Sequence, residues 1–195
     1  MLLQEKIGAV MVVGGGIAGI QAALDLADSG YYVYLVERSG AIGSTMAKLA
    51  KTFPTNDCSM CILSPKLVEC SRHLNIELKT LTEVVKIAGE VTNFTVTLRQ
   101  QPRYVDMDRC IACAKCSRRC PRDVPDEFNE RIGFRKAIYV RYPQAVPLKY
   151  QVDPEHCDRL LGGDCRICED ACPAHALRFD DQVREYSVRV GSIIM

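Results

Sequence analysis

Eleven cysteines in a chain of 195 residues constrain the fold more than any other feature of this sequence. Ten of them fall into three tight groups, at residues 58–61, 110–120 and 157–172. No secretory leader is recognisable at the N-terminus, so we expect a cytoplasmic protein. Clustered cysteines in that reducing compartment bind metal more often than they form disulfides. The cysteine count therefore favours metal binding over a disulfide framework.

The second cysteine group has the spacing of a bacterial ferredoxin. It reads Cys110-x2-Cys113-x2-Cys116-x3-Cys120-Pro121. The two-residue gaps let one short loop supply three corners of an iron–sulfur cubane, and the fourth cysteine usually ligates the other cluster of a pair. This motif predicts a [4Fe–4S] cluster.

The third group repeats the motif with one change. It reads Cys157-x7-Cys165-x2-Cys168-x3-Cys172-Pro173. The first gap has seven residues instead of two, and the insert 158–164 contains two glycines that would let it bulge outward as a turn. We expect a second [4Fe–4S] cluster here, with Cys157 as its least regular ligand.

The two motifs are expected to share ligands, as in ferredoxins with two clusters. One cluster would take Cys110, Cys113, Cys116 and Cys172, and the other would take Cys120, Cys157, Cys165 and Cys168. Zinc is the alternative, because paired Cys-x2-Cys units also build tetrahedral zinc sites. Each half of such a zinc site needs two cysteines, whereas the first motif supplies three within seven residues, which favours clusters over zinc.

A glycine-rich motif lies near the N-terminus and reads Gly14-Gly15-Gly16-x-x-Gly19. It follows an apolar run at 8–13, which predicts a buried strand, and it opens a helical pattern that ends at 28–30. A second strand is predicted over 32–36, and Glu37 follows it. This order is typical of a dinucleotide-binding crossover, in which glycines admit the pyrophosphate and the acidic residue binds a ribose hydroxyl. The motif does not choose between FAD and NAD, and a purely structural glycine turn is the alternative.

The rest of the chain is organised around these motifs. Residues 40–75 are irregular, whereas alternation of apolar residues predicts strands over 76–81, 93–98 and 183–194. Between the second and third of these strands, the cysteine motifs replace the alternation of apolar residues. The net charge of +1 provides no field toward nucleic acid, and no apolar run is long enough to span a membrane.

The order of the motifs resembles that of the A subunits of heterodisulfide reductase and of a related quinone-interacting oxidoreductase complex. The most distinctive segment is 52–66, which reads TFPTNDCSMCILSPK, and 145–149 and 191–194 match as well. Ala112 and Ala114 stand where ferredoxin loops usually have glycine, a change that is tolerated if the loop keeps ordinary dihedral angles.

The resemblance implies an α/β fold: a partial Rossmann-like, thioredoxin-reductase-like FAD-binding domain with an inserted α+β two-cluster ferredoxin-like domain. The expected segments are 1–100 for the FAD-binding domain, 101–182 for the insert and 183–195 for a returning strand. The expected cofactors are FAD and two [4Fe–4S] clusters. Family chains continue beyond residue 195, so this chain resembles an N-terminal fragment.

The resemblance also implies a function and partners. The chain would be an oxidoreductase subunit that passes electrons between FAD and clusters, together with other subunits of a heterodisulfide-reductase-like complex and a chain supplying the rest of the flavin domain. The alternative is a ferredoxin-like carrier or scaffold that binds no flavin.

Several residues outside these motifs have open roles. Cys58 and Cys61 are half of a further metal site, a redox dithiol, or two buried cysteines near the flavin pocket. Cys70 is predicted to be a core residue. His73, His156 and His175 are predicted to be surface or loop residues rather than ligands. Arg118 and Arg119 are predicted to be a solvated pair, and the alternatives are that they raise the potential of one cluster or form a docking surface.

Overall fold

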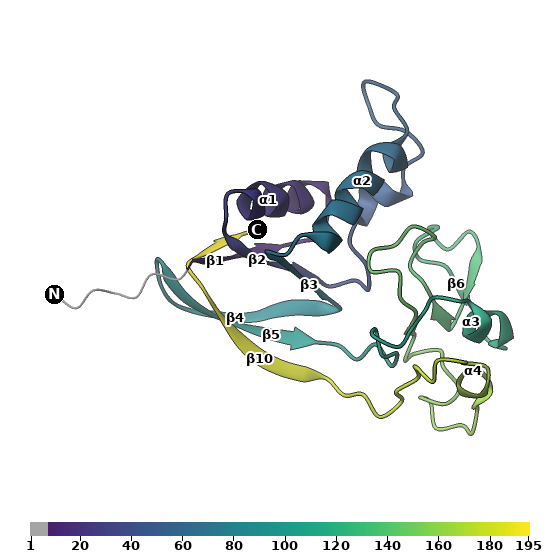
Figure 1. The fold of residues 1–195 in the computed structure, drawn as a ribbon. Coiled ribbons are helices and arrows are strands. Elements are labelled where there is room, and N and C mark those ends of the chain that lie inside the picture. The colour runs from purple at the N-terminus through teal and green to yellow at the C-terminus, as the bar shows by residue number, and fades with distance from the viewer. Residues whose placement is uncertain (1–7) are drawn as a thin grey trace. The chain divides into compact units, whose positions relative to one another are not determined.

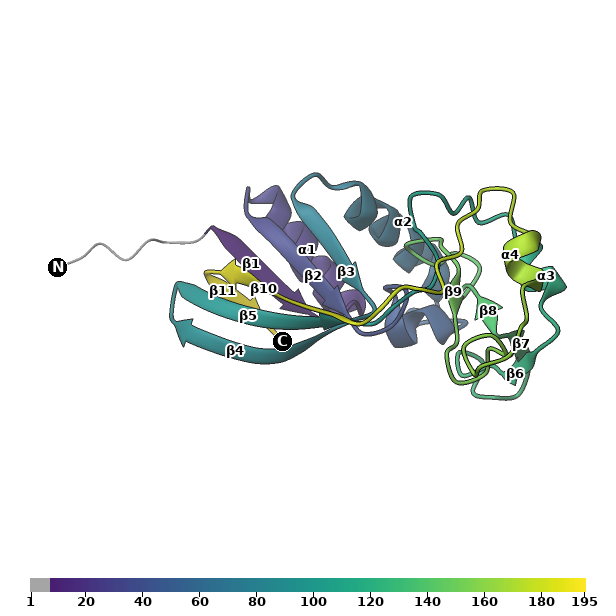
Figure 2. The same cartoon turned by 90° about the horizontal axis from the view of Figure 1, so that it is seen from below.

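The computed structural model describes residues 8–195 and divides into two compact units (Figures 1 and 2). Unit 1 contains the residues up to Gln101 together with Val183–Met195. Unit 2 contains Pro102–Gln182. In sequence, unit 2 is therefore inserted between two segments of unit 1.

Unit 1 is built on a parallel sheet with the strand order β11-β1-β2-β3. Its strands are β1 (Ala9–Val13), β2 (Tyr32–Glu37), β3 (Ile76–Thr80) and β11 (Ser192–Ile194). The interiors of β1 and β2 are largely buried, as expected of strands that are covered on both faces. The strands predicted near residues 8–13, 32–36 and 76–81 are confirmed.

Helix α1 (Ile17–Asp28) joins β1 to β2 and lies on one face of the parallel sheet (Figure 1). Its buried side chains are Ile20, Ala23, Leu24 and Ala27. They recur at the spacing of one helical face, which explains why the segment packs as a helix. Gly30 follows with a φ of 89°, a left-handed conformation that commonly ends helices. The predicted helix is confirmed.

A three-stranded antiparallel sheet packs on the other face of the parallel sheet (Figures 1 and 2). Its strands are β4 (Thr82–Glu90), β5 (Asn93–Gln100) and β10 (Arg184–Val190). The side chains buried between the two sheets are Met11, Val36, Val96, Leu98 and Val190. Unit 1 thus has three layers, in the order helix, parallel sheet and antiparallel sheet, and the fold is mixed α/β.

The structure of unit 1 differs from the sequence predictions in three elements. Helix α2 (Ser59–Arg72) occupies a segment predicted to be irregular, with Pro65 inside the helix. Strand β4 was not predicted. The single strand predicted over 183–194 is wrong: the chain turns at Gly191, whose N–H donates to Ala9 O at 2.8 Å, and forms β10 in one sheet and β11 in the other.

Unit 2 consists of short elements joined by loops. They are α3 (Lys115–Arg119), α4 (Ile167–Asp170), β6 (Asp123–Pro125), β7 (Phe134–Lys136), β8 (Ile138–Tyr139) and β9 (Gln151–Val152). Buried apolar residues such as Val105, Ile138 and Leu177 pack with Cys110, Cys116 and Cys168 in one core.

A 3-10 helix, η1 (Ser44–Lys48), completes the described elements of unit 1. Across residues 8–195, no helix combines the length and apolar character that a membrane span needs.

Candidate iron–sulfur and dinucleotide sites

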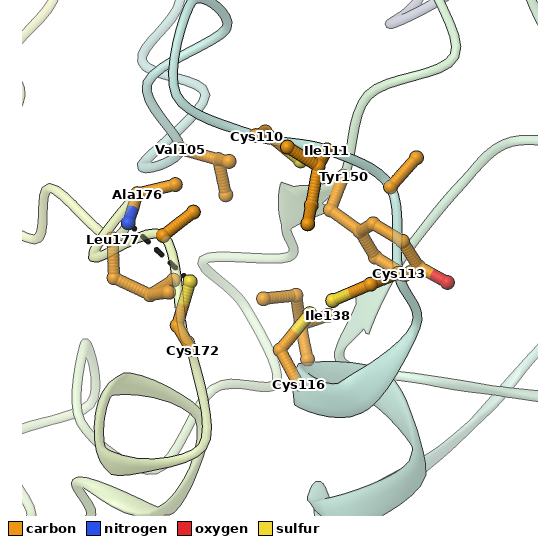
Figure 3. A pocket seen from close by; sticks show the side chains of 12 residues that line it. Val105, Cys110, Ile111, Cys113, Cys116, Ile138, Tyr150, Cys172, Ala176 and Leu177 are labelled. Carbon is orange, nitrogen blue, oxygen red and sulfur yellow. Dashed lines mark hydrogen bonds between the residues drawn. The ribbon is translucent and has the colours of Figure 1, made fainter.

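One cavity of unit 2, here called the first cavity, is lined by four cysteines (Figure 3). They are Cys110, Cys113, Cys116 and Cys172. Cys110 and Cys113 come from the loop that leads into α3, Cys116 comes from α3 itself, and Cys172 comes from the segment after α4, across the cavity. Val105, Ile138 and Leu177 contribute to a lining that is otherwise almost entirely apolar. The cavity has a volume of about 20 Å³.

A second cavity of similar size, also about 20 Å³, lies in the same unit and contains four cysteines as well. They are Cys120, Cys157, Cys165 and Cys168. Ala137, Val152 and Ile167 supply apolar lining, and Arg122 and Asp158 lie at the cavity as an ion pair. The structure therefore brings together the same two sets of four cysteines that the motifs predict, each completed by the last cysteine of the other motif.

The chemistry of each donor set fits a [4Fe–4S] cluster, which is held by four thiolates. Within residues 8–195, no three His, Cys, Asp or Glu side chains are placed so that they could hold a metal ion. The thiols of each set instead surround a cavity. Burial raises the pKa of Cys116 and of Cys168 to about 12, and neighbouring cysteines add to the effect. Ligation of a cluster would therefore release protons from these thiols.

The insert of the second motif forms a closed turn. Gly163 N–H donates to Asp158 O at 2.8 Å, so residues 158–164 return on themselves. Cys157 N–H donates to Asp153 O at 3.0 Å, which fixes the chain just before the turn. This closure lets Cys157 and Cys165 line the same cavity although seven residues separate them.

The loop of the first motif does not have ordinary dihedral angles. Ala112 has a φ of 54° and Ala114 a φ of 64°, both in the left-handed region that favours glycine. The condition under which alanine would be tolerated there, ordinary dihedral angles, is therefore not met. The chain needs these conformations to wrap Cys110, Cys113 and Cys116 around one cavity, and the alanine side chains make them costlier than glycine would.

The glycine motif forms the turn between β1 and α1. Gly14 has a φ of 113°, and its N–H donates to Val36 O at 2.8 Å. A Cβ atom at Gly19 would lie 1.9 Å from Gly14 O, so α1 can approach the strand this closely only with glycine there. Gly14 and Gly19 are thus required by the fold itself.

Gly16 is different, because neither conformation nor packing demands glycine there. Its φ is −78°, and a Cβ atom would meet only Ser44 Cβ at 3.6 Å, an ordinary contact. Gly16 is also the N-cap of α1, and in the described chain no side chain caps this helix. A helix N-terminus with no side chain over it can receive a phosphate group. The residues present therefore fit a dinucleotide pyrophosphate.

Glu37 lies beside this turn and is 9% exposed. One of its carboxylate oxygens accepts from Gly15 N–H at 2.8 Å, and the other accepts from Ser39 N–H at 2.7 Å. These two bonds fix the carboxylate at the end of β2, and each oxygen has a further lone pair for a hydroxyl donor. The position fits the predicted contact with a ribose.

Among the described residues, the other candidates do not line the two cavities. None of His73, His156 and His175 is among the residues that line the two cavities in the described part of the chain. Cys58 and Cys61 are exposed and joined by a disulfide, so the alternative of two buried cysteines is wrong. Arg118 and Arg119 are exposed. The core position predicted for Cys70 is confirmed, since its side chain is 0% exposed.

Two protein families match parts of this chain. The FAD dependent oxidoreductase family matches residues 9–61, which contain the glycine turn, and the 4Fe-4S binding domain family matches residues 103–126, which contain the first cysteine motif. Among solved structures, L-proline dehydrogenase from P. horikoshii aligns with 47% of this chain and 19% of its own, with 26% identity and a TM-score of 0.42.

Curated relatives match nearly the whole chain. The iron-sulfur A subunit of CoB–CoM heterodisulfide reductase from Methanocaldococcus jannaschii is 52% identical over 94% of this chain. An iron-sulfur A subunit of the same enzyme from Methanopyrus kandleri is 53% identical over 98%. The A subunit of H(2):CoB-CoM heterodisulfide,ferredoxin reductase from Methanothermobacter marburgensis is 45% identical over 95%.

The chain spans only about a quarter of the length of these relatives, since the alignments cover 27%, 28% and 27% of them. Within that span the similarity runs through the glycine turn, the segment around Cys58 and both cysteine motifs. Over the part that it spans, this chain belongs to the family of heterodisulfide reductase A subunits.

Proposed function

We propose that this chain is the electron-transfer part of an iron–sulfur flavoprotein, and that it passes electrons between FAD and two [4Fe–4S] clusters. The observation that carries the proposal is the pair of apolar cavities, each with four thiols, in the same chain as a glycine turn suited to a dinucleotide. A flavin exchanges electrons in pairs or singly, whereas a cluster carries one electron at a time.

The proposed ligands of the first cluster are Cys110, Cys113, Cys116 and Cys172, and those of the second are Cys120, Cys157, Cys165 and Cys168. The proposed FAD-binding residues are Gly14, Gly15, Gly16, Gly19 and Glu37. The apolar linings exclude water from the thiols, and the backbone of the glycine turn orients the pyrophosphate. The proposed domains remain 1–100, 101–182 and 183–195.

We further propose that the chain works within a cytoplasmic heterodisulfide-reductase-like complex, as part of one of its subunits. The names of the relatives support this, because they describe subunits of CoB–CoM heterodisulfide reductases. Further flavin contacts would come from sequence that this chain does not contain, on the same or another polypeptide. The whole reaction would then require these additional parts.

The test is the iron, sulfide, zinc and flavin content of anaerobically purified protein, with and without the co-expressed remainder of the relatives' length. About eight iron and eight sulfide per chain are expected for two cubanes. Zinc without sulfide would contradict the proposal. Iron without flavin in both samples would mean that the chain is a flavin-free ferredoxin-like carrier.

A matched pair of variants tests the glycine turn. Gly16→Ala should lower flavin affinity at least tenfold, a loss of about 1.4 kcal/mol in binding, without lowering the melting temperature of the flavin-free protein, because its Cβ would occupy space that only the ligand needs. Gly8→Ala is the control, since a Cβ there meets nothing within 4 Å. Equal flavin content in both variants would contradict a pyrophosphate site at Gly16.

A further inference from the structure

Unit 1 contains a pair of cysteines that neither cavity uses. Cys58 and Cys61 form a disulfide whose Cα atoms are 5.2 Å apart, within the usual range for this bond. Both residues are exposed to solvent. All eight thiols of the two cavities come from unit 2, so the pair in unit 1 is a chemically separate site.

The pair sits at the start of α2, where the backbone holds one sulfur in place. Cys58 is the N-cap of this 14-residue helix, and its Sγ accepts a hydrogen bond from Cys61 N–H at 3.2 Å. A thiolate at that position is stabilised by the same N–H and by the helix dipole. Cys58 is therefore the better nucleophile of the two when the disulfide is reduced.

The chain on both sides of Cys58 is fixed, so the pair does not depend on a loose loop. Cys58 forms an antiparallel bridge with Lys51. The next residue, Ser59, is fully buried, and its hydroxyl donates to Met46 O at 2.6 Å. These contacts keep the two sulfurs together in the oxidised and the reduced states.

The same contacts connect the pair to the glycine turn. Met46 belongs to η1, and η1 begins after Gly43, whose N–H donates to Gly15 O at 2.7 Å. Ser44 is the residue that a Cβ at Gly16 would meet. The cysteine pair is thus one short element away from the turn that fits a pyrophosphate, within one compact unit.

We propose that Cys58 and Cys61 form a reversible redox pair that reduces an external disulfide by thiol–disulfide exchange. The Cys58 thiolate attacks one sulfur of the external disulfide, which forms a mixed disulfide and releases the first thiolate. Cys61 loses its proton and attacks Cys58 Sγ, which releases the second thiolate and closes the protein disulfide. The pair loses two electrons and two protons, and the external disulfide gains both as two thiols.

This activity fits the pair better than a structural disulfide does. A disulfide between residues three apart closes a very short loop, where the constraint on the unfolded chain is smallest. Exposed disulfides are the labile ones, whereas structural disulfides resist reduction. Cys70 provides the contrast within the same helix, since burial raises the pKa of its thiol to about 12 and leaves it unreactive.

The test is a redox titration of the anaerobic holoprotein in mixtures of reduced and oxidised dithiothreitol, followed by acid quenching, alkylation and mass spectrometry. Trypsin separates residues 52–66, which contain both cysteines, from residues 67–72, which contain Cys70. The 52–66 peptide should pass from 10% to 90% reduced over about an eightyfold change in the ratio of the two reagents. The 67–72 peptide should carry a free thiol throughout, and the iron content should not change.

Two single variants assign the attacking sulfur. With Ellman's reagent, an aromatic disulfide, Cys61→Ser should form a stable mixed disulfide at Cys58 at least about tenfold faster than Cys58→Ser forms one at Cys61. Cys70→Ser is the control and should react like the unaltered chain. A 52–66 peptide that stays oxidised or stays reduced at every ratio would overturn the proposal. So would loss of iron in the Cys58→Ser/Cys61→Ser double variant, which would make the pair metal ligands.

Discussion

The two cavities of unit 2 hold the same number of thiols in nearly equal space, yet the chain builds them differently. In the first, three cysteines with two-residue gaps lie in one loop and the start of α3, and two alanines in that loop have left-handed φ angles. In the second, seven residues separate Cys157 from Cys165, and the intervening chain folds into its own turn. Regular spacing concentrates strain in the loop, whereas the insert avoids it.

The second cavity depends instead on support from outside the motif. Asp153, whose backbone carbonyl accepts from Cys157 N–H, has a side chain that is 9% exposed and accepts from Arg135 at 2.8 Å. Arg135 also pairs with Glu127 at 2.8 Å and stacks on the ring of Tyr139 at 3.8 Å. The buried ion pair of Asp153 and Arg135 thus helps to position Cys157, whose distance from Cys165 in sequence departs from the regular spacing.

The cavities also differ in the charges around them. Lys149 Nζ donates to Cys110 O at 2.7 Å beside the first cavity. Arg103 is 6% exposed, and burial lowers its pKa to about 10, although the nearby Cys110 opposes this shift. Arg103 therefore stays protonated at neutral pH. At the second cavity, the charge of Arg122 is balanced by Asp158. Positive charge favours a reduced cluster, so we expect the first cluster to have the higher potential.

Removing cysteine ligands should produce the largest effect, a loss of iron. Cys172→Ala and Cys113→Ala should each remove about four of about eight iron atoms per chain, because both remove a ligand of the first cluster. The double variant Cys113→Ala/Cys172→Ala should lose no more iron than either single variant. In contrast, Cys165→Ala/Cys172→Ala should lose nearly all of it. Iron analysis and the spectrum of the reduced protein measure both.

The opposite pattern of iron loss would contradict the sharing of ligands between the two motifs. If each motif held its own cluster, Cys165→Ala/Cys172→Ala would keep half of the iron, and Cys113→Ala/Cys172→Ala would lose all of it. Cys70→Ser should leave the iron content unchanged, since Cys70 lies in the core of unit 1, among residues that line neither cavity.

Removing the cation that supports the second cavity should destabilise the protein. Arg135→Met leaves the Asp153 carboxylate buried without its main partner, and losses of this kind cost about 3 to 5 kcal/mol. The second cluster should be lost before the first as urea is raised, which iron release and absorbance would follow. Lys136→Met is the matched control, because its partner Asp123 is exposed and such pairs contribute about 0 to 1 kcal/mol.

Lowering the pH should weaken the ion pair of Asp153 and Arg135. Burial alone would raise the pKa of Asp153, but hydrogen bonds from Arg135 and His156 outweigh it and hold the pKa below its usual value. The resulting stabilisation is complete above the unfolded value of about 3.9 and is lost as the pH falls through the lower folded value. Equal acid sensitivity of the unaltered protein and Arg135→Met would show that the pair does not stabilise the unit.

Most of the chemistry could be predicted from the sequence, because the motifs are local. Eight cysteines, four glycines and Glu37 are each defined by spacing to near neighbours. The missed helix α2 also has a local signal, since Leu63, Leu67 and Cys70 are buried at helical spacing. Pro65 makes the segment look irregular in the sequence, yet this proline is exposed and the apolar face is unaffected by it.

The remaining differences arise from contacts that no local pattern encodes. Strand β4 was missed because its pairing with β5 shifts between Val84 and Lys86, which interrupts the alternation. The supports of Cys157 come from Asp153 and Arg135, which no cysteine spacing indicates. The left-handed angles of Ala112 and Ala114 follow from wrapping a cavity, so alanine gives no hint of them.

The charge difference between the cavities should be measurable as a potential. In a Cys165→Ala background, where only the first cluster should remain, Lys149→Gln should lower its potential by about 50 mV, close to a tenfold change in equilibrium constant for one electron. Lys115→Gln is the control, since Lys115 is exposed to solvent and its charge is screened. Equal shifts in the two variants would mean that general charge, rather than the contact with Cys110, sets the potential.

The smallest expected effect tests the strain that only the first loop carries. Ala112→Gly removes the side chain that opposes a φ of 54°, which should stabilise the loop by about 1 to 2 kcal/mol. Glycine also adds freedom to the unfolded chain, at a cost of about 0.4 to 1 kcal/mol, so the net gain should be about 0.5 kcal/mol. Ala137→Gly is the control in the same unit, because Ala137 lies outside the left-handed region and is buried, and the change should only destabilise. If urea unfolding shows Ala112→Gly to be destabilised as much as Ala137→Gly, the first loop stores no strain, and the contrast between the two cavities reduces to their charges.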